Sequence, residues 1–273
     1  MNWLLRVAAL VLVFAASAIS QSKLSEETAS VGSSAGVRVP VVLELFTSEG
    51  CSSCPAADAL LAKLEQQQPI GGAEIIALEE HVDYWDHQGW VDPYSSSQWT
   101  QRQQAYAFGF GDHGIYTPEL VVNGRSGFVG SHEGHTYRAI AGAVEQQRTD
   151  VSVSLLKSEK PAHQHVKVAV GKLQGAQQGD LAEVWLAITE RALHSAVTGG
   201  ENSGHDLYHA AIVRWLHKAG TANGGEAASF TFTGESEVKL DPAWKRPNVR
   251  IVAFVQEKRS RHILGASSAR LEP

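Results

Sequence analysis

Hydrophobic positions in the first third of the chain follow two periods, one typical of strands and one typical of helices. Residues 39–46 are almost all apolar and predict a buried strand. Apolar residues then recur at helical spacing over residues 55–68, and Pro69 and the glycines after it end that helix. Residues 74–78 predict a second strand, which should lie parallel to the first through the helical crossover.

The pattern continues with a helical insertion and a hairpin. A tryptophan-rich stretch leads into a predicted helix at residues 95–108. Residues 120–129 alternate around Asn123-Gly124, the usual sequence of a two-residue hairpin turn. A closing helix is predicted at residues 136–147, so the first domain should span residues 38–148.

The second half alternates between apolar and polar positions with period two. Residues 208–216 fit either a helix or a strand, and we favour a strand. Several strands joined by polar turns predict an antiparallel β-sandwich at residues 150–273. The predicted strands are residues 151–155, 165–170, 183–188, 230–233, 249–255 and 263–271.

The chain has only two cysteines, and both lie between the first strand and the first helix. Cys51 should sit at the helix start, where free N–H groups and the helix dipole stabilise a thiolate. Cys54 follows one turn later and should resolve a mixed disulfide formed on Cys51. The pattern therefore predicts a redox-active pair, with Cys51 as the nucleophile and the more exposed thiol.

Three other interpretations of the pair remain open. A static disulfide is possible, but so short a loop removes little entropy from the unfolded chain. Half of a zinc site is possible, but the sequence has no second CxxC and no evident HxxxH partner. The third alternative is two unrelated buried thiols.

Thr117-Pro118 precedes the hairpin strand. A strand, a CxxC turn and a helix, followed later by Thr-Pro before a strand, resemble the thioredoxin fold. The resemblance implies that Pro118 is a cis-proline beside the cysteines and that the backbone of Thr117 pairs with the substrate chain. The alternative is a trans-proline that merely starts a strand. The expected fold class is a thioredoxin-like α/β domain followed by an all-β, sandwich-like domain.

The N-terminus and the charge bear on location and partners. Residues 1–20 combine Arg6, an apolar run and small residues, which is typical of a signal peptide. Residues 21–37 are small and polar and predict a flexible tether. We therefore expect a periplasmic or secreted protein with no membrane association after cleavage. The net charge of −6 and the lack of a basic block make nucleic acid an unexpected partner.

Longer blocks resemble a family of exported bacterial proteins known only as a domain of unknown function. The resemblance covers nearly the whole mature chain and implies a thioredoxin-like half and a β-rich half, but no substrate. Glu79, Glu80 and Glu119 depart from the usual pattern, and their charges would raise a thiolate pKa if they lie close. The matching blocks are residues 46–55, 81–86, 102–103, 116–118, 122–124 and 200–205, with His209 and residues 213–214.

Three acidic or imidazole side chains are further candidates for the site. Glu44 lies near the position where thioredoxin buries an acid, and it could accept the proton from Cys54. The alternative is an exposed strand-edge glutamate. His81 and Asp83 could form a pair that tunes the thiolate, or could only hold the insertion. In the second half, Glu201, His205, His209 and Arg214 could form a polar cluster.

The sequence thus predicts an exported thiol–disulfide oxidoreductase without a cofactor. Its expected partners are protein or small-molecule thiols and disulfides, together with a protein that reduces or oxidises it. The alternative is a copper-handling protein that binds Cu(I) through Cys51, Cys54 and a nearby histidine such as His81. A binding module with a vestigial site is a third interpretation. The Ser52-Ser53 linker does not distinguish a reductant from an oxidant.

Overall fold

The computed structural model describes residues 38–222 and 230–272, so the predicted signal peptide and the predicted tether lie outside the described residues. In chain order, the first half contains β1 (Val39–Thr47), α1 (Pro55–Gln67), β2 (Ala73–His81), α2 (Ser97–Phe110), β3 (Glu119–Val122), β4 (Ser126–Val129) and α3 (Glu133–Val144).

The second half is built from strands. It contains β5 (Val151–Leu156), β6 (His163–Gly171), β7 (Ala182–Glu190), β8 (Leu193–Ala196), β9 (Asp206–His209), β10 (Ile212–Ala222), β11 (Phe230–Lys239), β12 (Val249–Glu257) and β13 (Ile263–Arg270), with a short 3₁₀ turn at Arg246–Asn248. The ambiguous segment 208–216 is extended, as favoured, and contributes to β9 and β10. The strand β8 was not predicted.

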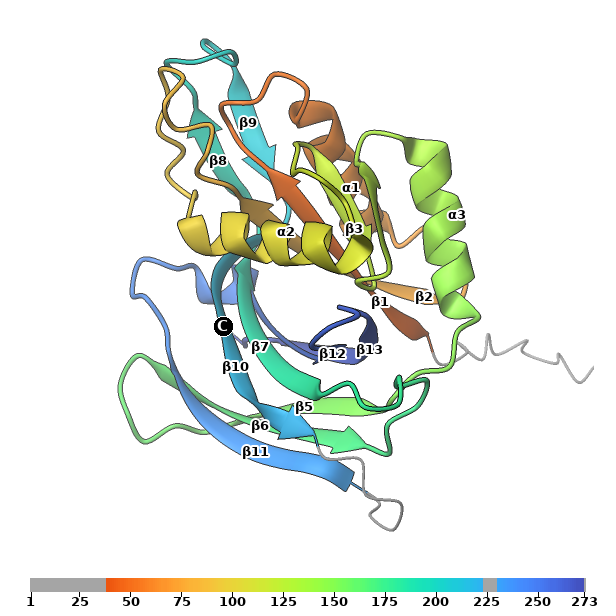
Figure 1. Cartoon of the computed structure of the whole chain (residues 1–273). Coiled ribbons are helices and arrows are strands. Elements are labelled where there is room, and N and C mark those ends of the chain that lie inside the picture. Colours follow the sequence, from red (N-terminus) through yellow and green to blue (C-terminus); the bar gives the residue numbers. More distant parts are fainter. Residues whose placement is uncertain (1–37, 223–229, 273) are drawn as a thin grey trace, which may run out of the picture. The chain divides into compact units, whose positions relative to one another are not determined.

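The predicted fold class, a thioredoxin-like α/β domain followed by a separate β-sandwich, is wrong. Strands from both halves form one mixed eight-stranded sheet in the order β13-β12-β7-β10-β2-β1-β3-β4 (Figure 1). The pair β1–β2 is parallel, β1–β3 is antiparallel, and β10 joins β2 in parallel at Ile212 and Glu79. The strands β11, β6 and β5 form a smaller sheet, and β8 pairs with β9.

The two halves share a sheet because β2 would otherwise present an open edge. The N–H of Glu79 donates to the carbonyl of Ala211 (2.9 Å), directly before β10 begins. Unpaired strand edges leave backbone groups unsatisfied, and pairing with β10 removes this cost. Period-two patterning identifies strands but does not say which strands pair with one another. The sequence therefore predicted two separate domains instead of one shared sheet.

Three hydrophobic clusters hold the sheet to its neighbours. On one face, α1 and α3 pack on alternate residues of β1 and β2, such as Leu43 and Ile75. On the other face, α2 packs through Trp99 and Tyr106 on strands of both halves, and Figure 1 shows α2 beside β7 and β10. The third cluster lies between β7 and β12 of the large sheet and β6 of the small one. The helix α2 therefore closes the junction between the halves.

A buried ionic network lies under α2. Glu44 of β1 is buried and faces this side with Val42 and Phe46. Its carboxylate accepts hydrogen bonds from Arg102 Nε (2.5 Å) and from the hydroxyl of Tyr106. Glu80 lies 3.4 Å from Arg102 Nε. Burial, and then the neighbouring charge of Glu44, raise the pKa of Glu80 well above its usual value.

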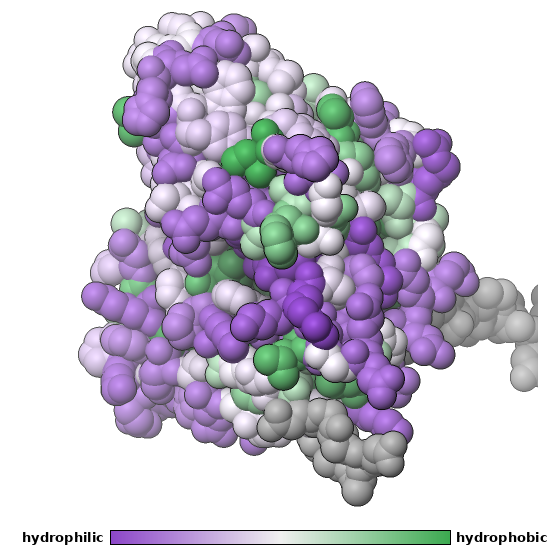
Figure 2. Space-filling model, viewed as in Figure 1, coloured by the Kyte–Doolittle hydropathy of each residue, from purple (hydrophilic) through white to green (hydrophobic). Residues whose placement is uncertain are grey.

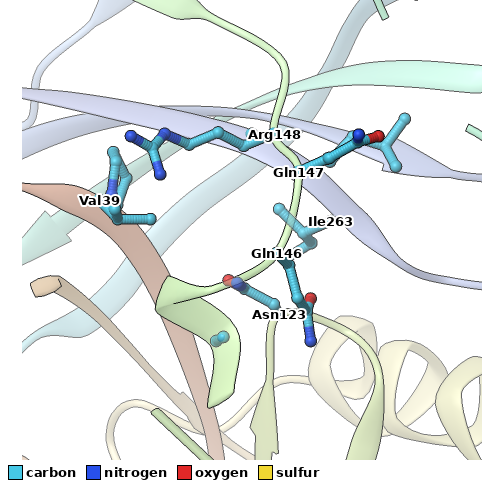
Figure 3. Close-up of a pocket in the computed structure, with 10 residues that line it drawn as sticks. Val39, Asn123, Gln146, Gln147, Arg148 and Ile263 are labelled. Atoms are coloured by element: carbon cyan, nitrogen blue, oxygen red, sulfur yellow. The ribbon is translucent and has the colours of Figure 1, made fainter. Parts of the chain in front are cut away.

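The turn between β3 and β4 abuts the turn between β12 and β13. The carbonyl of Asn123 accepts the N–H of Ile263 (2.9 Å), and its side-chain oxygen accepts the N–H of Val42. Gly124 has φ +62°, and a side chain there would meet the carbonyl of Arg261 at 1.9 Å. Figure 3 shows the adjoining crevice beside Asn123, Gln146 and Ile263. Its volume of about 10 Å³ holds one water at most, so this crevice is a packing contact and is too small for a ligand.

The face shown in Figure 2 is largely hydrophilic. Hydrophobic residues form small separate groups on it, so this face offers no broad apolar docking surface. In the part of the chain that the structure describes, no helix has the length and apolar character needed to cross a membrane.

The network under α2 gives a stability prediction. Changing Arg102→Met should destabilise the fold by about 3–5 kcal/mol, because the buried carboxylate of Glu44 loses its countercharge. Urea denaturation would measure the loss. The matched control is Lys63→Met, whose exposed ion pair with Glu133 (2.7 Å) should contribute about 1 kcal/mol or less. Equal losses in the two variants would contradict a structural role for the Arg102 network.

Candidate functional site

The two cysteines lie in the turn that joins β1 to α1. They form a disulfide, and Cys54, not Cys51, is the residue that caps the helix. Pro55 follows at the first helical position, where a missing N–H costs nothing. Cys51 therefore sits one turn before the helix, rather than at its first residue as the sequence suggested.

Both cysteines are fully buried, which corrects the expectation that Cys51 is exposed. Residues 197–205, between β8 and β9, lie over the turn. The side-chain amide of Asn202 donates to the carbonyls of Glu49 (2.8 Å) and Cys51 (3.0 Å). The Glu201 carboxylate accepts the N–H of Ser52 (2.9 Å). The second half of the chain thus supplies a cover that is hydrogen-bonded to the disulfide turn.

The Thr117–Pro118 peptide bond is cis, as the resemblance implied. The Thr117 hydroxyl accepts a hydrogen bond from the indole N–H of Trp85 (2.8 Å). Trp85 also packs against Gly50, where an added side chain would approach its Cβ within 3.2 Å. Trp85 therefore connects the Thr-Pro segment to the residue that precedes Cys51.

Glu44 does not face the helix that carries Cys54. It lies on the α2 side of the sheet in the Arg102 network, whereas α1 packs on the opposite face. Asp58 occupies the position on the α1 side that the sequence suggested for Glu44. It lies one helical turn after Cys54, is buried, and accepts the hydroxyl hydrogen of Thr47 (2.7 Å).

The structure pairs His81 with Asp92 rather than with Asp83. The Nδ1 atom of His81 lies 2.7 Å from Asp92 Oδ2. Asp83 instead accepts the hydroxyl hydrogen of Thr100 (2.6 Å). The residues with possible ligand atoms that come together include His81 but neither cysteine, among those the structure describes. The Cys51–Cys54–His81 copper set is therefore not assembled in this disulfide form.

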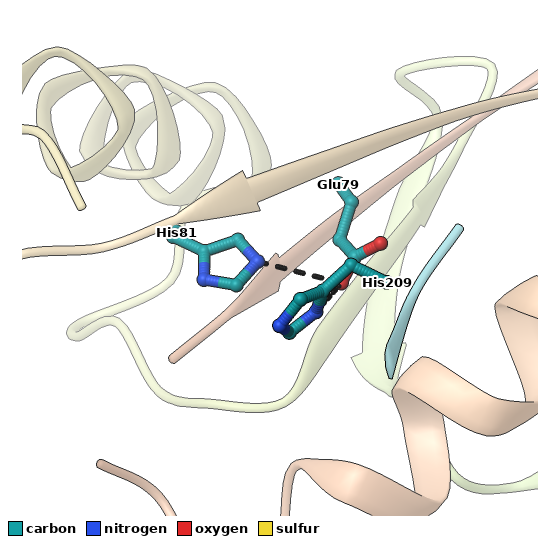
Figure 4. A group of neighbouring side chains, drawn as sticks. All are labelled: Glu79, His81 and His209. Carbon is teal, nitrogen blue, oxygen red and sulfur yellow. Dashed lines mark hydrogen bonds and ion pairs between the residues drawn. The ribbon is translucent and has the colours of Figure 1, made fainter. Parts of the chain in front are cut away.

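Glu79 lies at the centre of a buried polar cluster (Figure 4). Its Oε1 atom lies 2.8 Å from His209 Nδ1 and 3.4 Å from His81 Nε2. Its Oε2 atom accepts the backbone N–H groups of Ala210 (2.8 Å) and Ala211 (3.3 Å). The other ring nitrogen of His209 lies 3.0 Å from Glu49 Oε1. Since Glu49 is two residues before Cys51, the cluster adjoins the disulfide turn.

The ionisation of this cluster departs from that of the same groups in water. Burial disfavours the charge of Glu79, but the hydrogen bonds and charges of His209 and His81 outweigh it and hold its pKa well below the usual value. Burial also opposes the charge of His81, yet Asp92 and Glu79 raise its pKa. Against the same desolvation, Glu49 and Glu79 raise the pKa of His209 to about 9. The cluster therefore binds positive charge strongly.

Asp58 behaves in the opposite way. Burial, and then the negative charge of Glu79, raise its pKa to about 7. The hydrogen bond from Thr47 and the charges of His209 and His81 act against this shift. Asp58 can therefore exchange a proton near neutral pH.

From the sequence, Asp58 was missed and Glu79 was noted only as an added negative charge, although a signal for both residues exists. Glu79 lies on the same face of the buried strand β2 as Ile75 and Ala77. Asp58 follows Ala57 on the packed side of α1. Polar residues at positions predicted to be buried are uncommon and require partners. Of the second-half candidates, Glu201 and His209 reach the site. His205 lies beside the Asn202 carbonyl, and Arg214 lies 3.7 Å from Glu190.

Two solved structures share much of this architecture. Protein AGR_C_4864 from Agrobacterium tumefaciens is 28% identical, with a TM-score of 0.64, over 86% of this chain and 98% of that one. HBP35 of Porphyromonas gingivalis is 18% identical, with a TM-score of 0.61, over 86% of this chain and 76% of that one, and this likeness concerns the fold alone.

No curated protein matches the chain. A family match exists, however, and it spans residues 42–256, which include the disulfide, the cis-proline and the Glu79 cluster. The chain therefore belongs to the family described as "Protein of unknown function (DUF1223)".

Proposed function

We propose that this protein is an exported thiol–disulfide oxidoreductase that uses the Cys51–Cys54 disulfide. The observation that carries the proposal is the surroundings of the disulfide. A bridge across so few residues adds little stability, so stability alone does not explain it. Next to it, the fold buries ionisable groups with shifted pKa values, which are costly to bury and cluster at functional sites. The export part of the proposal rests on the signal-peptide pattern of residues 1–20.

The proposed reaction is a two-step thiol exchange. A client thiolate attacks Cys51 Sγ, the Cys51–Cys54 bond breaks, and Cys54 leaves as a thiolate. A second client thiolate then attacks the client sulfur of the mixed disulfide and releases Cys51. The client dithiol loses two electrons, and the protein pair gains them. Run in reverse, the same steps reduce a client disulfide.

We retain Cys51 as the proposed nucleophile although it is buried. The reason is now its position in the turn. Ser52 and Ser53, which follow it, are exposed, and the Sγ of Cys51 lies 3.4 Å from the Ser53 hydroxyl. Cys54 instead begins α1, one turn before the buried Asp58. Displacing the segment that holds Asn202 would open Cys51 first.

We assign the proton of Cys54 to Asp58. Asp58 lies one helical turn after Cys54, and a carboxyl group with a pKa of about 7 at that position can give a proton to the Cys54 thiolate and take it back. Thr47 holds this carboxyl through its hydroxyl.

The order of attack predicts which single variant traps clients. Cys54→Ser should accumulate mixed disulfides on Cys51, because attack survives and resolution does not, whereas Cys51→Ser should trap far less. Non-reducing gels of each reduced variant, incubated with an oxidised client protein, would measure the adducts. Trapping by Cys51→Ser alone would reverse the two roles. If neither variant traps adducts and the reduced pair binds Cu(I) one to one, the copper-handling alternative applies instead.

The cover predicts that the disulfide reacts slowly until residues 197–205 move. Asn202→Ala should increase the rate of reduction by dithiothreitol several-fold or more, because two hydrogen bonds that hold the cover are lost. Stopped-flow thiol assays would measure the rate. The control Asn248→Ala lies in the remote 3₁₀ turn and should leave the rate unchanged. If both rates match that of the unmodified protein, the cover does not limit access.

The proposed role of Asp58 predicts that its loss slows the step in which Cys54 attacks a mixed disulfide on Cys51. With an aromatic thiol loaded on Cys51, Asp58→Asn should slow its release by Cys54 about tenfold or more near pH 7. In the unmodified protein the rate should rise with pH through about 7, as Asp58 loses its proton, and this inflection should vanish in the variant. Absorbance of the released thiol gives both results. Slowing by Glu44→Gln but not by Asp58→Asn would return the role to Glu44.

A further inference from the structure

The oxygen and nitrogen atoms around Glu79 are arranged as the ligands of one ion. Glu79 Oε1, His81 Nε2 and His209 Nδ1 lie within 4.8 Å of one another, and Figure 4 shows both imidazoles turned toward the carboxylate. The two nitrogens lie 3.4 and 2.8 Å from the oxygen. Ligands around a tetrahedral ion, with bonds of about 2.1 Å, are separated by about 3.4 Å.

The partners of the other ring nitrogens fix where the protons lie. Asp92 Oδ2 also accepts the N–H of Glu49 (2.8 Å), so it acts as an acceptor, and the Nδ1 of His81 donates to it. The Nε2 of His209 likewise donates to Glu49 Oε1. In neutral imidazoles, the remaining nitrogens then direct lone pairs at Glu79 Oε1, itself an acceptor. Three electron-rich atoms then face one point, where either the protons of imidazolium forms or one bound cation can supply positive charge.

The surroundings match the outer shell of a metal site. Histidine ligands almost always donate their other N–H to a carboxylate or carbonyl, and both histidines here do so. The carboxylate is also fixed, because Glu79 Oε2 accepts the N–H groups of Ala210 and Ala211. All three side chains are buried, so water does not compete for them.

We propose that Glu79, His81 and His209 bind a divalent transition-metal ion. Two imidazoles and one carboxylate suit zinc and ferrous iron, rather than calcium or magnesium, which prefer oxygen ligands. The proposal is independent of the thiol–disulfide function, because neither cysteine contributes a ligand. The two sites adjoin through Glu49, which holds His209 and lies two residues before Cys51.

Metal binding can be tested on the full mature chain with its disulfide intact. Because the ligands are buried, the protein is refolded from denaturant with excess Zn²⁺ or Co²⁺, desalted, and analysed for bound metal. We expect one ion per chain, a Co²⁺ visible spectrum typical of nitrogen and oxygen ligands, and a higher Tm with metal. A metal-free protein whose Tm does not respond would overturn the proposal and leave only a proton-bound network.

Variants then locate the ion. His209→Ala removes a ligand and should abolish retention. Asp92→Asn keeps all three ligands and the side-chain shape, and should weaken affinity about 10–100-fold. The matched control is His194→Ala, an exposed histidine 2.9 Å from Asp206, which should bind as the unmodified protein does. Circular dichroism verifies that each variant folds, and Asp92→Asn decides the matter if His209→Ala does not fold. Unchanged affinity in Asp92→Asn would overturn the site.

The double variant Cys51→Ser/Cys54→Ser separates this site from the thiols. It should retain the ion while losing all thiol exchange. If it loses the metal, the ligands are the cysteines and the proposed site is wrong. Since thiol exchange and metal content are measured separately, either proposal can fail while the other stands.

Discussion

The structure depends on how Glu79 joins the two halves of the chain. Its N–H pairs with the carbonyl of Ala211, and its carboxylate accepts the N–H groups of Ala210 and Ala211. One residue thus satisfies backbone groups at the point where β10 meets β2, which would otherwise be an open strand edge. The same carboxylate contacts His209, so one residue both joins the sheet and holds the polar cluster.

The sheet divides its buried charges between two faces with different consequences. On the α2 face, Arg102 lies among the carboxylates of Glu44 and Glu80, and this network closes the junction between the halves. On the other face, the cluster of Glu79 adjoins the disulfide turn and contains two histidines. Burying charges costs several kcal/mol per ion unless they are paired. The first network pairs Glu44 with Arg102 and Tyr106, whereas the second leaves two imidazole nitrogens facing a carboxylate.

The disulfide is built from the first half and covered by the second. Glu201 and Asn202, in the segment between β8 and β9, bind the backbone of the CxxC turn. His209 ends β9 and binds both Glu49 and Glu79. Any displacement of β9 therefore alters the cover and the polar cluster together, which links the two sites that we propose. The family match spans residues from both halves.

The sequence by itself determined the local structure. The cis bond at Pro118 was implied by the resemblance to the thioredoxin fold. Hydrophobic periodicity located most of the strands and helices, including the extended segment 208–216, and the CxxC spacing placed the two sulfurs within bonding distance. Each of these depends on residues close together in the chain, so local spacing contains the information. Period-two alternation along β1 accounts for Glu44 lying on the same face as Val42 and Phe46.

Tertiary structure alone decided which strand pairs with β2 and which charges meet. His81 pairs with Asp92 rather than with Asp83, which is closer in the sequence. His209 contacts Glu79, 130 residues away in the sequence. Asp58 replaced Glu44 beside Cys54 because α1 covers the opposite face of the sheet from α2. The burial of Cys51 likewise follows from Asn202, 151 residues away. Period-two patterns are alike for every strand edge, and a buried charge is stabilised by whatever partner the completed sheet brings near, so these contacts have no local signature.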